Sequence, residues 1–233
     1  LFNNSGAGGV GWPSQAGAGT SSIPSPTAPA PGAVNYASSA AANAEARFGP
    51  AAGGAGLRVP TASGQIAVGF MYDAVVGLPD SSYGSGATGA RIAIGLGDSS
   101  GTPHGLTADT PTSVAAAGRG GLQFQYSTNR SDSNWQVLAV KRVSSTVTAT
   151  VTDTAVPFAA NGSWWRMRFW SRPDRSNKVI WILERLDAAA CAVGEVTADI
   201  PDYYDQYHQA GIRTLTNTAR YFRIRSIEIR TPY

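Results

Sequence analysis

"NGSWWRMRFWSRPDRSNKVIWILERLD", residues 161–187, holds four of the six tryptophans of the chain, together with five arginines and one lysine. Two interpretations fit this composition. Cationic side chains between aromatic rings are typical of a groove that binds single-stranded nucleic acid. They are also typical of two neighbouring strands of a β-sandwich, with bulky side chains on one face and cations on the other.

Period-two alternation in this stretch favours the sandwich. In a strand over 163–170, one face carries Trp165, Met167 and Phe169. The other face carries Trp164, Arg166, Arg168 and Trp170. After a turn, the apolar run of 178–186 predicts a second strand that is buried on both faces. Arginine stems commonly cover neighbouring aromatic rings on such surfaces, so we interpret the stretch as a hairpin of a sandwich rather than as a platform for stacked bases.

Strand-like runs recur along residues 57–233, which we predict to form one globular domain. They lie at 64–72, 90–96, 121–127, 134–141, 145–152, 163–170, 178–186, 193–198, 211–216 and 220–230. Turn residues separate them, and PDYYDQYHQ (201–209) is the one plausible short helix. Around ten strands with hardly any helix predict an all-β sandwich or barrel. The core is expected to contain Phe124, Trp135, Trp165, Trp181 and Ile224.

Residues 1–56 differ in composition, because Glu45 and Arg47 are their only charged residues and Gly, Ala, Ser, Pro and Asn dominate. We predict an extended N-terminal arm, with a short alanine-rich helix as an option over 35–49. Such a segment buries too little apolar surface to order itself. It would therefore lie on the chain's own sandwich, on copies of the chain or on a partner. We predict that the arm runs along a neighbouring protein in a symmetric homo-oligomer. The anchoring side chains would be those of Phe2, Trp12, Ile23, Tyr36 and Phe48.

Composition limits the partners of the chain. The net charge of +3 is modest and sixteen of the eighteen cations are arginine, which supports loose binding of polyanions at best. Cys191 is the only cysteine, so an intrachain disulfide and a cysteine metal site are excluded. No stretch approaches the roughly 18 apolar residues of a membrane span, so no membrane partner is expected.

The sequence contains few of the residue patterns that are typical of catalytic sites. Glycoside hydrolysis needs two carboxylates about 5–9 Å apart, most simply placed at i and i+2 of one strand, and no Asp/Glu pair has that spacing. Distant carboxylates could still converge in the fold. His104 and His208 stand alone in the sequence, and there is no G-x-S-x-G elbow. We expect no catalytic residues and a protein that is not an enzyme, with glycoside hydrolysis as the alternative.

Calcium is the one metal candidate. "GDSSG" (97–101) and "NRSDSN" (129–134) offer Asp98, Asp132 and Asn134 as oxygen ligands. These residue types also cap turns, and without a dense acidic cluster turn capping is the favoured interpretation. "GLGDSSG" lacks the lysine and the helix of a phosphate loop, so no cofactor is expected.

An ordered series of motifs resembles a known family. "VGFMYDA", "ARIAIGLGDSSG", "LQFQYSTNRSDSNWQVLAV", "VTDTAVPF", "GSWWRMRFW", "KVIWILERLD", "TADIPD" and "ARYFRIRSIEIR" follow one another over residues 68–230. This order is similar to that of the concanavalin A-like jelly-roll domains of tailed-bacteriophage structural proteins. The resemblance covers most of the domain and none of the arm. It implies a two-sheet antiparallel jelly roll and a virion component, and it implies no catalytic residues.

The resulting hypothesis is a non-enzymatic structural protein of a phage particle. It would serve as a head decoration, a head fibre or a tail-associated protein, anchored to major capsid or tail proteins by its arm with the jelly roll projecting outward. Lectins and glucanases share this fold, so fold does not settle function. The rival is a domain that binds or degrades carbohydrate, with a host surface glycan as its partner. Nucleic-acid binding ranks third and would depend on Arg166, Arg168 and Arg223.

Overall fold

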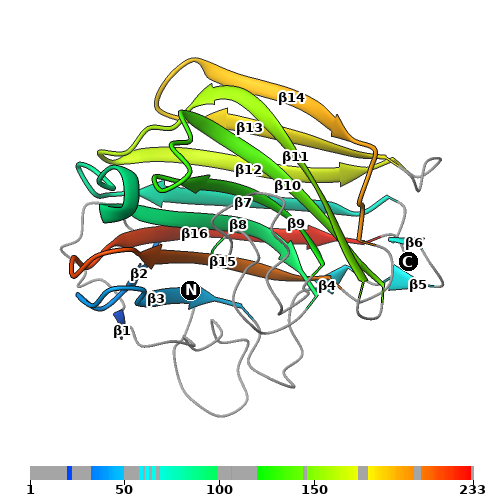
Figure 1. Ribbon diagram of the computed structural model, residues 1–233. Helices are drawn as coiled ribbons and strands as arrows, with labels where there is room; N and C mark the ends of the chain where they lie inside the picture. The colour runs from blue at the N-terminus through cyan, green and yellow to red at the C-terminus, as the bar shows by residue number, and fades with distance from the viewer. Residues whose placement is uncertain are drawn as a thin grey trace, which may run out of the picture.

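The computed structural model describes residues 33–49, 69–98, 106, 120–143, 146–172, 178–201 and 206–231, together with the backbone of 20–22, 58–59, 61–62 and 65–66. These residues form two seven-stranded antiparallel sheets that pack face to face (Figure 1). The predicted all-β jelly-roll sandwich is therefore confirmed. Strands β2 and β3 (blue) lie at one side of the molecule and β14 (orange) at the other.

Sheet A follows the order β1-β2-β16-β7-β12-β13-β14. Its strands are β1 (Thr20–Ser22), β2 (Val34–Ala37), β16 (Tyr221–Arg230), β7 (Met71–Leu78), β12 (Ser163–Ser171), β13 (Val179–Arg185) and β14 (Ala190–Val196). Sheet B follows the order β11-β10-β9-β8-β15-β3, with β4 also paired to β15. Its strands are β11 (Thr146–Pro157), β10 (Asn134–Val143), β9 (Gly121–Ser127), β8 (Ala90–Gly97), β15 (Gln206–Thr214), β3 (Glu45–Phe48) and β4 (Arg58–Val59).

Two short elements complete the described chain. Strands β5 (Thr61–Ala62) and β6 (Gln65–Ile66) form a small hairpin, and Gly86–Thr88 form one 3₁₀ turn, η1. None of the helical residues described here forms a helix long and apolar enough to cross a membrane.

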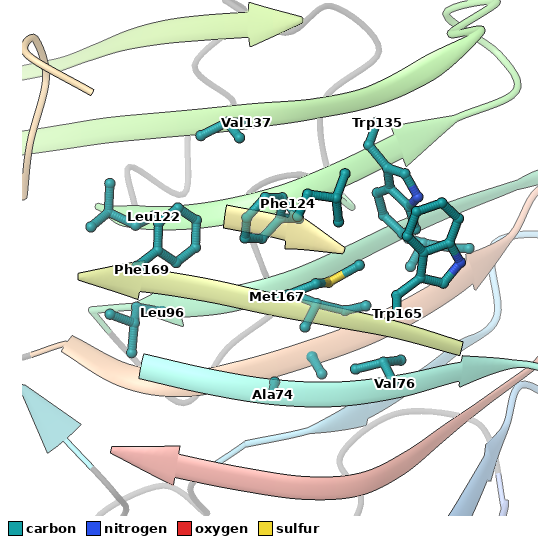
Figure 2. Close-up of a cluster of buried hydrophobic side chains, with 14 of the residues drawn as sticks. Ala74, Val76, Leu96, Leu122, Phe124, Trp135, Val137, Trp165, Met167 and Phe169 are labelled. Carbon is teal, nitrogen blue, oxygen red and sulfur yellow. The ribbon is translucent and has the colours of Figure 1, made fainter. Parts of the chain in front are cut away.

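The core lies between the inner faces of the two sheets and is rich in aromatic rings. Figure 2 shows Trp135 of β10 beside Trp165 of β12, with ring centroids 5.6 Å apart in an edge-to-face arrangement. Phe124 stacks on Phe169 at 4.7 Å. Such pairs stabilise a core beyond the area that they bury. The five predicted core residues, Phe124, Trp135, Trp165, Trp181 and Ile224, are all buried, which confirms that prediction.

Residues 33–49 belong to the sandwich and not to an arm. Strand β2 pairs with β16 in sheet A and β3 pairs with β15 in sheet B, so the short helix considered over 35–49 is wrong. A turn with Asn43 at φ 62° joins the two strands. Tyr36 and Phe48 enter the core, where their rings lie 5.4 Å apart. Pairing and burial thus outweigh the weak helix preference of alanine.

Three smaller expectations also change. Residues 206–209 are strand rather than helix, because β15 pairs with β8 on one side and with β3 and β4 on the other. The strand predicted at 64–72 splits into β6 and β7, and Gly69, with φ 76°, lies two residues before β7. Strand β13 is buried on one face only, since Ile180 and Ile182 are half-buried on the outer side.

Candidate functional site: the outer face of sheet A

Strand β12 has two different faces. Trp165, Met167 and Phe169 point into the core and are fully buried, as the alternation predicts. The outward side chains are Trp164, Arg166, Arg168 and Trp170. Trp170 is 40% exposed and Trp164 is half-buried, so both indoles are reachable from solvent. The strand therefore contributes its inner half to the fold and its outer half to a surface.

Strand register extends this surface across sheet A. Trp164 lies opposite Gly77 of β7, Gly77 lies opposite Arg223 of β16, and Arg223 lies opposite Asn35 of β2. Directly opposite residues of antiparallel strands point to the same face. Trp164, Gly77, Arg223 and Asn35 consequently form one outward row, which we call the Trp164–Arg223 row.

The indole of Trp164 lies across Gly77. A Cβ atom placed on Gly77 would stand 3.0 Å from two carbons of the six-membered ring and 3.1 Å from a third, so the ring covers this glycine. A side chain at this position would force the indole to shift by a few tenths of an ångström. Because Gly77 stands between Trp164 and Arg223 in the row, the indole extends from β12 towards β16. An aromatic ring therefore lies next to the Arg223 position.

Arg223 is held in place at the other end of the row. Its Nε donates a hydrogen bond of 2.7 Å to Oδ1 of Asn35. Tyr221, two residues earlier on β16, is 40% exposed and also faces outward. Two accessible aromatic side chains thus flank one fixed guanidinium.

Asp80 supports the backbone of this corner. Its Oδ2 accepts a hydrogen bond of 3.1 Å from the amide of Tyr221. Burial raises the pKa of Asp80 from 3.8 to about 6, while that hydrogen bond and the charges of Arg220 and Arg223 act in the opposite direction. At neutral pH the carboxylate is ionised and partly balances the arginines beside it.

Arg166 and Arg168 are both bound to Asp73 of β7. Arg166 donates from Nε and Nη2 to Asp73 Oδ2 at 2.9 and 2.7 Å, and Arg168 donates from Nε to the same oxygen at 2.8 Å. Asp73 is only 6% exposed, and burial is the main reason that its pKa is raised. Charge-assisted pairs of this geometry orient the guanidinium groups. The outer face of β12 therefore carries fixed rather than mobile arginines.

Two carboxylates converge here in a way that the sequence spacing did not predict. Asp73 of β7 lies directly opposite Glu228 of β16, and the charge of Glu228 is one of the causes that raise the pKa of Asp73. Asp73 is bound by Arg166 and Arg168, and Glu228 accepts a hydrogen bond from Arg230. Both carboxylates are thus held in ion pairs. These pairs orient the side chains and balance the charge of the surface.

A second polar surface, on the outer face of sheet B, is covered. It comprises Arg91, Gln123, Gln125 and Gln209, which are all 5% exposed or less. Leu106 lies against it: its carbonyl accepts a hydrogen bond of 3.2 Å from Arg91 Nη1, and its Cδ1 would stand 2.7 Å from a Cβ on Gly211. Solvent does not reach these amides, so we place the candidate site on sheet A.

The residues proposed for calcium serve other roles. Asp132 accepts hydrogen bonds from the amide of Ser127 and from Arg130, and Asn134 donates to Asp153. Asp98 accepts from the amide of Gly120. These contacts are those of turn caps and ion pairs. Within the described ranges, no three His, Cys, Asp or Glu side chains gather as a metal site would require.

The two histidines differ in what the structure describes. His208 is buried in the core against Tyr72 and Phe48, away from the outer face of either sheet. His104 lies outside the described residues, and Cys191 is an exposed free thiol. Of the five proposed anchors, Tyr36 and Phe48 are core residues of this chain rather than contacts for a neighbour. Phe2, Trp12 and Ile23 lie outside the described residues.

Sequence reasoning named Trp164, Arg166 and Arg223 but missed Asn35, Gly77 and Tyr221. One sequence feature pointed to β7: Asp73 and Gly77 alternate with apolar residues along MYDAVVGL. A polar residue in such a run indicates an outward face. Asn35 carried no comparable indication, because its importance arises from pairing with a strand almost at the other end of the chain.

No protein-family model matches the chain, and no curated protein matches it in sequence. Solved structures do match it in fold. A seed lectin of Lotus tetragonolobus superposes with a TM-score of 0.57 at 10% identity, covering 99% of this chain and 95% of the lectin. The exoplasmic/lumenal domain of VIP36, in its Ca²⁺/Man3GlcNAc-bound form, gives 0.53 at 10% identity, with 94% and 84% covered.

A protein of unknown function from Shewanella oneidensis MR-1, SO2946, superposes with a TM-score of 0.51 at 16% identity, covering 94% of this chain and 77% of that one. Identities this low carry the architecture and not the activity. The chain thus has the concanavalin A-like jelly-roll fold of the legume lectins.

Proposed function

We propose that the chain is a carbohydrate-binding protein without catalytic activity, and that it holds a glycan on the Trp164–Arg223 row. The observation that carries this proposal is the accessible indole of Trp164, fixed over Gly77 and adjacent to the Arg223–Asn35 pair. Sugars present apolar C–H faces beside hydroxyl groups. A site for them needs an apolar surface and a few placed polar groups.

The parts of the row match these two needs. The ring of Trp164 offers a flat apolar surface, while the guanidinium of Arg223 donates and the amide of Asn35 both donates and accepts hydrogen bonds. Tyr221 adds a second exposed ring. Because Asn35 and Gly77 hold the two main side chains in place, less entropy is lost when a ligand binds.

The fold is compatible with this function. VIP36 has the same architecture, and its structure holds Man3GlcNAc. Carbohydrate cleavage remains the alternative, and it would require Asp73 and Glu228 to act as an acid and its partner. Each carboxylate is instead held in ion pairs, Asp73 with Arg166 and Arg168 and Glu228 with Arg230, so neither is free to approach a substrate.

Binding of the purified protein to a panel of neutral and acidic polysaccharides tests the proposal, by affinity electrophoresis and by calorimetry with oligosaccharides. Trp164→Ala should abolish retention. Trp170→Ala is the matched control, since it removes the same side chain from the same face of β12 about 20 Å away, at about 3.3 Å per residue. Equal binding by the wild type and both variants, or no binding to any glycan, would refute the proposal. Shortened polysaccharide chains after incubation would mean that the protein is an enzyme.

A structural role in a bacteriophage particle is our second proposal. It is supported by the motif series, whose segment LQFQYSTNRSDSNWQVLAV covers most of β9 and most of β10 and whose last segment forms β16. Major capsid or tail proteins would then be the partners, the virion would be the location, and a homo-oligomer is expected. Imaging an intact particle with a labelled copy of this chain tests it, and the absence of the label from purified particles would contradict it.

A further inference from the structure

We infer that the glycan held by the Trp164–Arg223 row is acidic, with a carboxylate or sulfate group that pairs with Arg223. This inference rests on the proposed function and adds the class of sugar. It depends on how the charges of the outer face of sheet A cancel. Most of these charges are balanced by an opposite charge of the protein itself.

The centre of the face is neutral. Asp73 binds Arg166 and Arg168, and Glu184 of β13 lies directly opposite Arg166. Two carboxylates therefore balance two guanidinium groups in this cluster. A ligand would meet little net charge at this position, although the side chains remain polar.

The borders of the face are also balanced. Arg230 pairs with Glu228, Lys178 with Glu195, and Arg185 with Asp187. Asp80 lies close enough to Arg220 and Arg223 to feel both charges, and it offsets one of them. After this cancellation among the described ion pairs named above, positive charge remains on β16 around Arg223 and Arg225.

The two remaining arginines lie where a stacked sugar would place its substituents. Arg223 occupies the row with Trp164, and Arg225 is an exposed residue at the bulge of β16 between Ile224 and Ser226. From β12 to β16 the row spans two strand spacings, about 10 Å. A guanidinium forms paired, charge-assisted hydrogen bonds with planar carboxylates and with sulfates. A sugar ring on Trp164 can thus present an anionic group to Arg223.

Single-stranded nucleic acid is the competing polyanion, and the charge pattern disfavours it. Binding an extended strand requires a row of cations that follows the phosphates, together with aromatic platforms for successive bases. Arg166 and Arg168 would supply that row, but they are already neutralised by Asp73 and Glu184. An isolated pair of arginines beside an indole fits a discrete anionic sugar better than a repeating phosphate backbone.

Calorimetry with matched ligands tests the inference on the full chain. Oligogalacturonate and its methyl ester share the same sugar backbone and differ in the charge of the esterified carboxyl group. Dextran sulfate and dextran form a second pair, which separates sulfate from carboxylate recognition. We expect at least one acidic member to bind at least about tenfold more tightly than its neutral partner, since hydrogen bonds to charged groups contribute about 1.5–3 kcal/mol.

Variants assign the effect to the row. Arg223→Gln should weaken binding of the acidic ligand at least about tenfold more than it weakens binding of the neutral partner. Arg230→Gln is the control, because it removes the same charge from the same strand and face at the far end of β16. It should change the affinity less than about twofold, as expected for a distant, exposed charge.

The outcomes separate the two proposals. Equal affinity for acidic and neutral partners, lost in Trp164→Ala but not in Arg223→Gln, would overturn the inference and keep carbohydrate binding. No binding to any sugar would overturn both. Oligo(dT) that binds as tightly as the best sugar, with a steep dependence on salt, would replace the acidic glycan with nucleic acid.

Discussion

His208 is a buried titratable group whose protonation should destabilise the fold in mild acid. Its side chain is 3% exposed and lies between Tyr72 and Phe48, with ring centroids at 5.6 and 4.8 Å. Nδ1 shares a hydrogen bond of 2.9 Å with the Tyr72 hydroxyl, while among the described residues Nε2 has no partner. A second N–H on the imidazolium would therefore find no acceptor. Burial accordingly lowers the pKa of His208 from 6.5 to about 3.

The sign and size of the effect follow from this shift. A lowered pKa means that the unfolded chain takes up a proton below pH 6.5 and the folded chain does not until about pH 3. Stability is thus present above pH 6.5 and is lost as the pH falls. Each pH unit costs about 1.4 kcal/mol, so lowering the pH to 5 reduces the free energy of unfolding by about 2 kcal/mol. At pH 5 this value depends on the unfolded pKa alone, because the folded histidine is still neutral.

Other groups titrate in the same range and must be separated from His208. The pKa of Asp80 is raised to about 6, so its folded form binds a proton below pH 6 and gains stability as the pH falls. This effect opposes that of His208. The informative quantity is therefore the difference between the wild type and a variant without the buried histidine. Asp80 and the second histidine, His104, cancel in this difference.

Urea unfolding at pH 8 and pH 5 measures that difference. His208→Phe combined with Tyr72→Phe removes both partners of the buried hydrogen bond, which leaves no unpaired polar group. The double variant should lose about 2 kcal/mol less than the wild type between the two pH values. Tyr72→Phe alone is the control and should keep the full pH dependence. Identical pH dependence in the wild type and the double variant would show that the core histidine is not what destabilises the protein in acid.

Three further predictions concern the fold, and chemical denaturation and circular dichroism can check them. Trp165→Ala should reduce the free energy of unfolding by about 3–5 kcal/mol, whereas Trp164→Ala on the outer face should cost only about 1 kcal/mol; similar losses would contradict the assignment of the two faces. Gly95→Ala should cost about 3 kcal/mol or more, because φ is +157° and the new Cβ would stand 2.1 Å from the Leu122 carbonyl oxygen. Deleting 1–32 should leave a folded sandwich and deleting 1–49 should not, since the longer deletion removes β2 and β3; a folded product of the longer deletion would sink this prediction.

The inner half of the fold was predictable because burial leaves a local pattern. Phe124, Trp135 and Trp165 stand in strands where buried and outward residues alternate at period two. Each of these strands was predicted close to its observed position. Strands β2 and β3 were not predicted. Strands β2 and β3 have four residues each, lie in an alanine-rich segment and obtain their partners from β16 and β15, more than 160 residues away. Local propensity carries no information about such pairing.

The candidate site was predictable only in part, for the same physical reason. Trp164 and Arg223 are unusual enough to be noticed singly, but Asn35, Gly77, Trp164 and Arg223 become one row only when four strands adopt their register. Charge is similarly non-local. The arginines of β12 look like a cationic groove until the fold places Asp73, from a strand more than 90 residues earlier, in ion pairs with both of them.

The two interpretations of the stretch over 161–187 therefore describe opposite faces of the same strand. The side chains that fill the core, Trp165, Met167 and Phe169, have no access to solvent and hold the sandwich together. The intervening residues form a surface whose central charges cancel, so that a strong nucleic-acid site is disfavoured and a small positively charged area on β16 remains. Because successive residues face opposite sides of the sheet, stability and binding can be altered independently by substitutions one residue apart. Comparing the Trp164 and Trp165 variants tests this separation directly: Trp164→Ala should lose ligand binding with little loss of stability, and Trp165→Ala should reduce the free energy of unfolding by about 3–5 kcal/mol.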